Sequence, residues 1–124
     1  MRIISGSLRG RDLGRVPDGV RPTTDRVRES LFSSLGAMDG CSVLDLFAGT
    51  GALGLEAYSR GAERVVFVER SKRVARTLRK RLETLGLADE ERLRLVVTDA
   101  RRAISRLTEE GGDAFDLVFV DPPY

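Results

Sequence analysis

Four short apolar runs, separated by longer amphipathic stretches, restrict the fold of this chain more than any other feature. The runs cover residues 42–47, 63–69, 93–98 and 115–120 and are dominated by Val, Leu and Phe. Apolar residues at consecutive positions are typical of strands that are buried on both faces of a parallel sheet. Between the runs, apolar residues recur every three or four positions, as they do in helices. The alternation predicts an α/β fold, doubly wound, with a mostly parallel sheet covered by helices on both faces.

A further helix is predicted ahead of the first strand. It is indicated by Val27, Leu31, Leu35 and Met38, which recur at helical spacing and would form its apolar face. A threonine or an aspartate lies near its expected start, where such residues cap helices.

The chain is expected to hold one core, because 124 residues are too few for two comfortable domains. We predict a basic N-terminal arm over residues 1–23 and a core over residues 24–124. The sequence ends directly after the fourth apolar run, and a complete α/β domain would hardly end on an uncovered strand. We therefore expect a core that is truncated after its fourth strand and belongs to a longer protein. Such a fragment need not be active by itself.

Composition excludes several kinds of chemistry. Cys41 is the only cysteine and there is no histidine, which excludes an internal disulfide, a Cys/His zinc cluster and a histidine base. No metal site is predicted. No stretch approaches the roughly 18 apolar residues of a membrane span, and the first residues lack the apolar run of a signal peptide. We expect a cytoplasmic protein that does not contact a membrane.

Positive charge is concentrated at the start of the chain. Residues 1–28 contain seven arginines and three aspartates, among several glycines and prolines typical of a flexible loop. A flexible basic segment of this kind suits a polyanion such as nucleic acid. A second basic cluster, residues 70–81, is explained equally well as the solvated face of a helix. The predicted RNA-binding residues are Arg9, Arg11, Arg21, Arg26 and Arg28.

A glycine-rich segment follows the first predicted strand. Residues 45–54 read Asp-Leu-Phe-Ala-Gly-Thr-Gly-Ala-Leu-Gly and contain the spacing G-x-G-x-x-G. In a dinucleotide site, such a turn receives a pyrophosphate, which the Asp45 carboxylate would repel. S-adenosylmethionine has no phosphate and carries a sulfonium and an ammonium group, both of which tolerate a nearby anion. Asp45 therefore favours S-adenosylmethionine as the cofactor.

Two further acids end the second and third predicted strands. Glu69 is placed to accept both ribose hydroxyls of the cofactor, and Asp99 to receive an amino group of adenine. A strand-ending acid that merely caps the next helix explains Asp99 equally well. The predicted cofactor-binding residues are Asp45, Phe47, Gly49, Thr50, Gly51, Glu69, Asp99 and Ala100.

The chain ends with the corner Asp121-Pro122-Pro123-Tyr124. Two consecutive prolines fix φ and remove two backbone donors, which leaves a rigid corner rich in acceptors. The Asp121 carboxylate and the Pro122 carbonyl can each accept one hydrogen of an exocyclic amine, and Tyr124 can stack on a base. Holding both hydrogens aims the nitrogen lone pair at a methyl group. We predict Asp121, Pro122 and Tyr124 as catalytic residues.

This corner resembles that of class I methyltransferases with a Rossmann-like fold that modify exocyclic amines. Within that group the chain resembles the RsmD family, which methylates a guanine N2 in bacterial small-subunit ribosomal RNA. The resemblance covers residues 2–6, 9–11, 21–32 and 45–57 and the final corner, and residues 21–29 are its most specific part. It implies an S-adenosylmethionine-dependent RNA methyltransferase whose partner is ribosomal RNA, either free or within an assembling small subunit.

Two other functions stay open at this point. A methyltransferase acting on DNA adenine, DNA cytosine or a protein glutamine would present its amine to the same corner. An NAD-dependent oxidoreductase is compatible with the glycine spacing and Glu69, and it is disfavoured by Asp45 and the proline corner.

Overall fold

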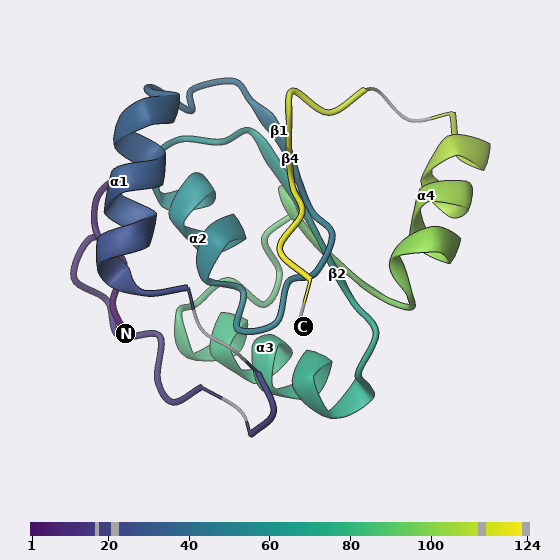
Figure 1. The fold of residues 1–124 in the computed structure, drawn as a ribbon, viewed down its shortest axis with the longest axis horizontal. Coiled ribbons are helices and arrows are strands. Elements are labelled where there is room, and N and C mark those ends of the chain that lie inside the picture. The colour runs from purple at the N-terminus through teal and green to yellow at the C-terminus, as the bar shows by residue number, and fades with distance from the viewer. Residues whose placement is uncertain (17, 21–22, 112–113, 123–124) are drawn as a thin grey trace.

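The computed structural model describes residues 1–16, 18–20, 23–111 and 114–122. Its centre is a sheet of four parallel strands, in the order β3-β2-β1-β4 (Figure 1). The strands are β1 (Ser42–Asp45), β2 (Arg64–Glu69), β3 (Leu93–Val97) and β4 (Leu117–Phe119). Each lies within one of the predicted apolar runs. The order of the strands along the sheet reverses at β1: β2 and β3 lie on one side of it and β4 lies on the other. Open α/β sheets bind ligands at such a point, beside the carboxyl ends of the strands.

Helices cover both faces of the sheet, as predicted. They are α1 (Asp25–Leu35), α2 (Ala52–Ser59), α3 (Lys72–Thr84) and α4 (Ala100–Glu109). The first three contribute to one apolar cluster, and α4 contributes to a second cluster on the opposite face (Figure 1). The doubly wound α/β fold class is confirmed. No helix in the described ranges is long and apolar enough to span a membrane.

The predicted apolar face of α1 is only partly correct. Leu31 packs against the core and Met38, which follows the helix, is 4% exposed. Val27 is 54% exposed and Leu35 is 37% exposed, whereas the helix buries Arg28 and Phe32. Phe32 packs against Phe119 of β4, with ring centroids 5.7 Å apart. Arg28 turns inward because it forms an ion pair with a buried carboxylate, and hydrophobic spacing cannot reveal such a pair.

The first residues of the chain are packed against the core, in contrast to the flexible loop expected for them. Ile3 and Leu13 are buried in the apolar cluster that contains α2. The Ser7 backbone N–H donates to the Ser59 carbonyl at 2.7 Å. Gly6 has φ +88° there, and a Cβ would collide with that carbonyl. The start of the predicted arm is therefore packed against α2, while the carbonyls of Arg15 and Asp18 accept hydrogen bonds from Arg81 and Arg73 of α3.

Candidate active site

The carboxyl ends of the strands meet at a pocket of about 460 Å³, a size typical of small-molecule sites. The segments after β1, β2, β3 and β4 all reach its wall. Eight predicted site residues line it: Phe47, Gly49, Thr50, Glu69, Asp99, Ala100, Asp121 and Pro122. Residues that are far apart in the sequence thus share one cavity, because parallel strands end at the same edge of the sheet.

Two of the predicted cofactor residues do not line this pocket. Asp45 is 1% exposed and lies beneath the glycine loop, where its Oδ2 accepts a hydrogen bond of 3.2 Å from the Gly54 backbone N–H. Gly51 has φ +80°, and a Cβ there would collide with the Leu78 side chain. Both residues shape the loop and the start of α2 from below.

Burial raises the pKa of Asp45 to about 7. The carboxylates of Asp121 and Glu69 raise this pKa further, while the hydrogen bond from Gly54 opposes the rise. The pKa of Asp45 is higher in the folded protein than its ordinary value of 3.8. The contribution of Asp45 to the free energy of unfolding is therefore largest when the pH is below 3.8. This contribution is lost as the pH rises through about 7.

Asp45→Asn is therefore expected to stabilise the protein at neutral and higher pH. Asparagine cannot ionise, and it keeps an oxygen that can accept from Gly54. The free energy of unfolding of the variant, relative to that of the wild type, should rise by on the order of 2 kcal/mol between about pH 5 and about pH 8. Urea denaturation at both pH values measures this difference. An advantage that is equal at the two pH values would contradict the assignment of a raised pKa.

Glu69 is held rigidly at the end of β2. Its Oε1 accepts from the Gly49 backbone N–H at 3.0 Å, and its Oε2 accepts from the Ser71 backbone N–H at 2.8 Å. Each carboxylate oxygen has a second lone pair. The side chain therefore keeps the capacity to accept hydroxyl groups in the pocket while it orders the glycine loop.

Asp99 caps a helix and also lines the pocket. Its Oδ1 accepts from the Arg102 backbone N–H at 2.8 Å, which caps α4. Arg102 Nε lies 3.6 Å from Oδ2. Asp99 therefore caps α4, which was one of the two roles that the sequence left open. It also lies on the wall of the pocket, as the other role requires.

The corner after β4 reaches the same pocket. Asp121 and Pro122 lie on its wall, and the Thr23 hydroxyl donates to Asp121 Oδ2 at 3.2 Å. Pro123 and Tyr124 lie outside the described residues, so the predicted stacking role of Tyr124 stays a prediction. Thr23, together with Gly19 and Val20, brings the N-terminal segment to the pocket. Sequence reasoning missed these three residues, although Thr23 lies in the most specific part of the family resemblance.

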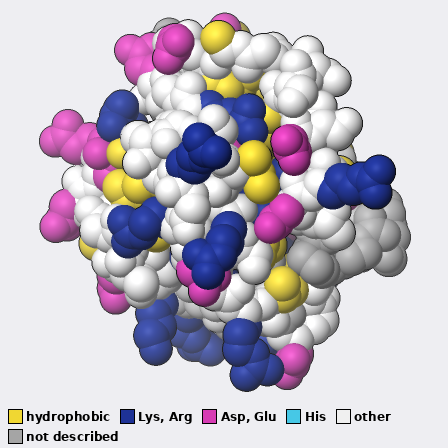
Figure 2. All heavy atoms as spheres, turned by 90° about the vertical axis from the view of Figure 1, so that its left-hand side faces the viewer, with side chains coloured by type: hydrophobic (Ala, Val, Ile, Leu, Met, Phe, Trp, Pro, Cys, Tyr) yellow, Lys and Arg dark blue, Asp and Glu magenta, His cyan; other side chains and the backbone are white. Residues whose placement is uncertain are grey.

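The predicted RNA-binding arginines have different environments. Arg9, Arg11 and Arg26 are exposed, and Arg21 lies outside the described residues. Figure 2 shows Lys and Arg side chains across the face of the molecule that corresponds to the left-hand side of Figure 1. Arg28 is 0% exposed, and its Nη1 donates to Glu56 Oε1 at 3.1 Å. Because its guanidinium is enclosed, the predicted RNA contact of Arg28 is wrong and its role is structural.

A family model described as "Conserved hypothetical protein 95" matches residues 1–124. This chain belongs to that family. A curated relative from Escherichia coli (strain K12), "Ribosomal RNA small subunit methyltransferase D", is 44% identical over 127 residues. The match covers 100% of this chain and 60% of the relative. The chain therefore spans less than two thirds of the length of this relative.

Two of the solved structures that this chain resembles are described as methyltransferases. "Putative methyltransferase yhhF from Escherichia coli" matches with a TM-score of 0.81 and 44% identity, over 100% of this chain and 64% of that one. Another structure, described as "a putative methyltransferase complexed with SAH", matches with a TM-score of 0.68 and 28% identity. That match covers 85% of this chain and 27% of the other.

Proposed function

We propose that this chain is the cofactor-binding part of an S-adenosylmethionine-dependent methyltransferase that acts on ribosomal RNA. The observation that carries the proposal is the convergence of Glu69, Asp99 and Asp121 on one pocket at the carboxyl edge of the sheet. The names of the similar curated and solved proteins support both the reaction and the substrate class. SAH, present in one similar structure, is the product that S-adenosylmethionine leaves after methyl transfer.

The pocket fits this cofactor better than a dinucleotide. A pyrophosphate needs the backbone N–H groups of the glycine loop as donors. Here the N–H of Gly49 donates to Glu69, that of Gly51 to the Ala48 carbonyl, and that of Ala52 to the Thr50 hydroxyl. Carboxylates at the ends of β2 and β4 add negative charge to the wall. The NAD-dependent alternative is disfavoured by these contacts.

Each acid has a distinct proposed role. Glu69 accepts the ribose hydroxyls and Asp99 the adenine amino group, while the bound cofactor supplies an electrophilic methyl group on its sulfonium. The Asp121 carboxylate and the Pro122 carbonyl accept the two hydrogens of the target amine, which localises the lone pair on its nitrogen. Asp121 can then take up the proton that the amine loses on methylation.

We place the target at the exocyclic N2 of a guanine, because of the resemblance to the RsmD family and the acceptors of the corner. The substrate is proposed to be small-subunit ribosomal RNA, either free or within an assembling subunit, and the place of action the cytoplasm. The test is transfer of labelled methyl from S-adenosylmethionine by the full-length protein to ribosomal RNA, to assembling subunits, to DNA and to protein. Nucleoside analysis should find N2-methylguanosine. Label in DNA or protein alone would overturn the choice of substrate.

Glu69→Ala is expected to weaken S-adenosylmethionine binding by about 10- to 100-fold, the cost of losing hydrogen bonds to a charged acceptor. Calorimetric titration measures the affinity, and NAD serves as the competing ligand. Glu63→Ala removes an exposed carboxylate outside this pocket and should leave the affinity unchanged. Unchanged affinity in a folded Glu69→Ala variant, or tighter binding of NAD, would contradict the assigned cofactor site.

Replacing Arg9 and Arg11 with alanine is expected to weaken RNA binding and to flatten its salt dependence. The slope of log affinity against log salt should fall by about 0.7 to 0.9 for each phosphate that the variant no longer neutralises. Arg101 and Arg102 on α4 are also exposed and provide a control pair with the same change of charge. If both double variants change the slope equally, net charge and not the N-terminal surface accounts for binding.

A further inference from the structure

Thr23 connects the N-terminal segment to the proposed catalytic corner. Its hydroxyl donates to Asp121 Oδ2 at 3.2 Å across 98 positions of sequence, and both residues line the pocket. Asp121 is exposed and follows β4, the edge strand of the described sheet. A carboxylate in such a position has several rotamers, and a hydrogen bond that it accepts favours one of them. The Thr23 hydroxyl donates such a bond.

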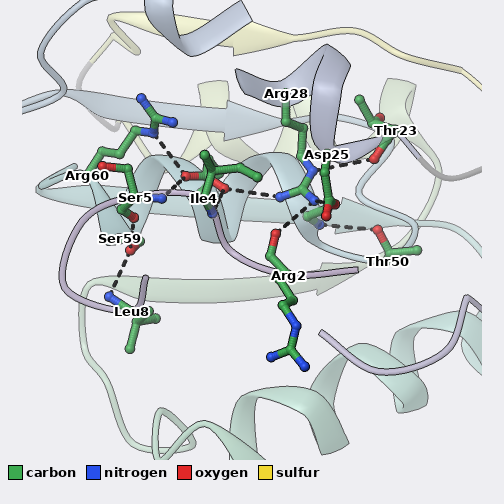
Figure 3. A network of polar contacts seen from close by, with 12 residues as sticks. Arg2, Ile4, Ser5, Leu8, Thr23, Asp25, Arg28, Thr50, Ser59 and Arg60 are labelled. Atoms are coloured by element: carbon green, nitrogen blue, oxygen red, sulfur yellow. Dashed lines mark hydrogen bonds and ion pairs between the residues drawn. The ribbon is translucent and has the colours of Figure 1, made fainter. Parts of the chain in front are cut away.

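The backbone of Thr23 is itself held from the interior. Arg28 Nε donates to the Thr23 carbonyl at 3.4 Å, while its Nη2 donates to the Arg2 carbonyl at 3.0 Å (Figure 3). The same guanidinium forms ion pairs with Asp25 and Glu56. Arg28 is fully buried, so its donors have fixed directions. Thr23 is thus attached to the enclosed part of the molecule.

Glu56 of α2 completes this support. Its carboxylate is fully buried and accepts from the backbone N–H groups of Ile4 at 2.9 Å and Ser5 at 3.1 Å (Figure 3). Arg60 Nε donates to it at 2.9 Å. Among the described residues, every buried side-chain nitrogen and oxygen has a hydrogen-bond partner. Buried polar networks in which every group is paired restrict the motion of their members. Here such a network connects Glu56 of α2 with the Thr23 carbonyl through Arg28.

We infer that Thr23 is a positioning residue that orients the Asp121 carboxylate in the pocket, with the Arg28–Glu56 pair as its buried support. The inference rests on the proposed function, because Asp121 needs a fixed orientation only if it receives the target amine. A carboxylate held before the substrate arrives loses less freedom on binding and keeps its acceptor directed at the amine.

The neighbouring threonine has a separate role. Thr24 is the N-cap of α1, and its Oγ1 accepts from the Val27 backbone N–H at 3.2 Å. Helix capping therefore does not require the Thr23 hydroxyl. The adjacent pair offers a matched comparison, in which one hydroxyl contacts the pocket and the other stabilises a helix.

The experiment compares Thr23→Val, Thr23→Ser and Thr24→Val in the full-length protein. Valine keeps the shape of threonine without the hydroxyl, and serine keeps the hydroxyl. Thr23→Val is expected to slow single-turnover methyl transfer by about 10- to 100-fold, with cofactor affinity unchanged, and Thr23→Ser to restore the rate. Thr24→Val should lower the melting temperature and leave the rate near that of the wild type.

A second readout does not depend on activity. Three-bond NMR couplings of Asp121 report whether its side chain occupies one rotamer or averages over several. We expect the wild type and Thr24→Val to favour one rotamer, and Thr23→Val to populate this rotamer less. A single rotamer together with a normal rate in Thr23→Val would overturn the inference and leave the proposed function intact. If the wild type methylates no RNA, the proposed function fails, and the couplings alone then decide whether Thr23 holds Asp121.

Discussion

Asp121→Ala is expected to slow methyl transfer by about 10²- to 10³-fold, the usual effect of removing one positioned electrostatic group. The proposed tasks of Asp121 are to accept a hydrogen of the target amine and to help the methylated nitrogen lose its proton. Alanine performs neither task. Cofactor affinity should stay nearly unchanged, because the proposed contacts to ribose and adenine come from Glu69 and Asp99.

Asp121→Asn separates shape from charge at the same position. Asparagine keeps one acceptor oxygen and removes the negative charge, so its rate should lie between those of the wild type and Asp121→Ala. Single-turnover transfer to RNA by the full-length protein measures the chemical step, and calorimetry measures cofactor binding separately. Near-normal transfer by Asp121→Ala would remove the corner from the chemistry and leave a cofactor-binding fold of unknown reaction.

Glu56→Ala is expected to lower the free energy of unfolding by about 3–5 kcal/mol, because it leaves the buried guanidinium of Arg28 with only the half-exposed carboxylate of Asp25 as an ion-pair partner. The substitution also removes the acceptor for the backbone N–H groups of Ile4 and Ser5. The described part of the N-terminal segment should therefore loosen from α2. Urea denaturation measures the loss of stability, and amide hydrogen exchange at Ile4 and Ser5 locates it.

Two comparisons test whether the loss comes from the buried pair. Glu63→Ala removes an exposed carboxylate and should change stability by no more than about 0.5 kcal/mol. Replacing both partners, as in Arg28→Met with Glu56→Leu, removes the buried charges together and should recover the part of the loss that comes from the buried charge of Arg28, while the N–H groups of Ile4 and Ser5 stay without this acceptor. A loss below about 1 kcal/mol for Glu56→Ala would show that the pair contributes little to the fold.

The order of elements was readable from local patterns. The two central strands, β1 and β2, are apolar at consecutive positions because both of their faces are covered, and that environment leaves a signal in the sequence. α3 followed its predicted period closely, since Val74, Leu78 and Leu82 are buried on one side. α1 did not, because its inward face includes Arg28. A charged residue in a helix is normally predicted to be exposed. Arg28 is buried because it pairs with Glu56, which lies 28 positions away and cannot be identified as its partner from local spacing.

The sequence by itself determined the α/β class, the edge of the sheet at which the pocket lies and eight of the twenty residues on the pocket wall. These features follow from periodicity and from the rule that parallel strands end together. Only the tertiary structure decided that Asp45 supports the loop from below, that Arg28 is enclosed and that Thr23 meets Asp121. Each depends on which distant groups share a buried volume or a hydrogen bond. Such contacts leave no local pattern, because a side chain's burial and charge environment are set by residues remote in the chain.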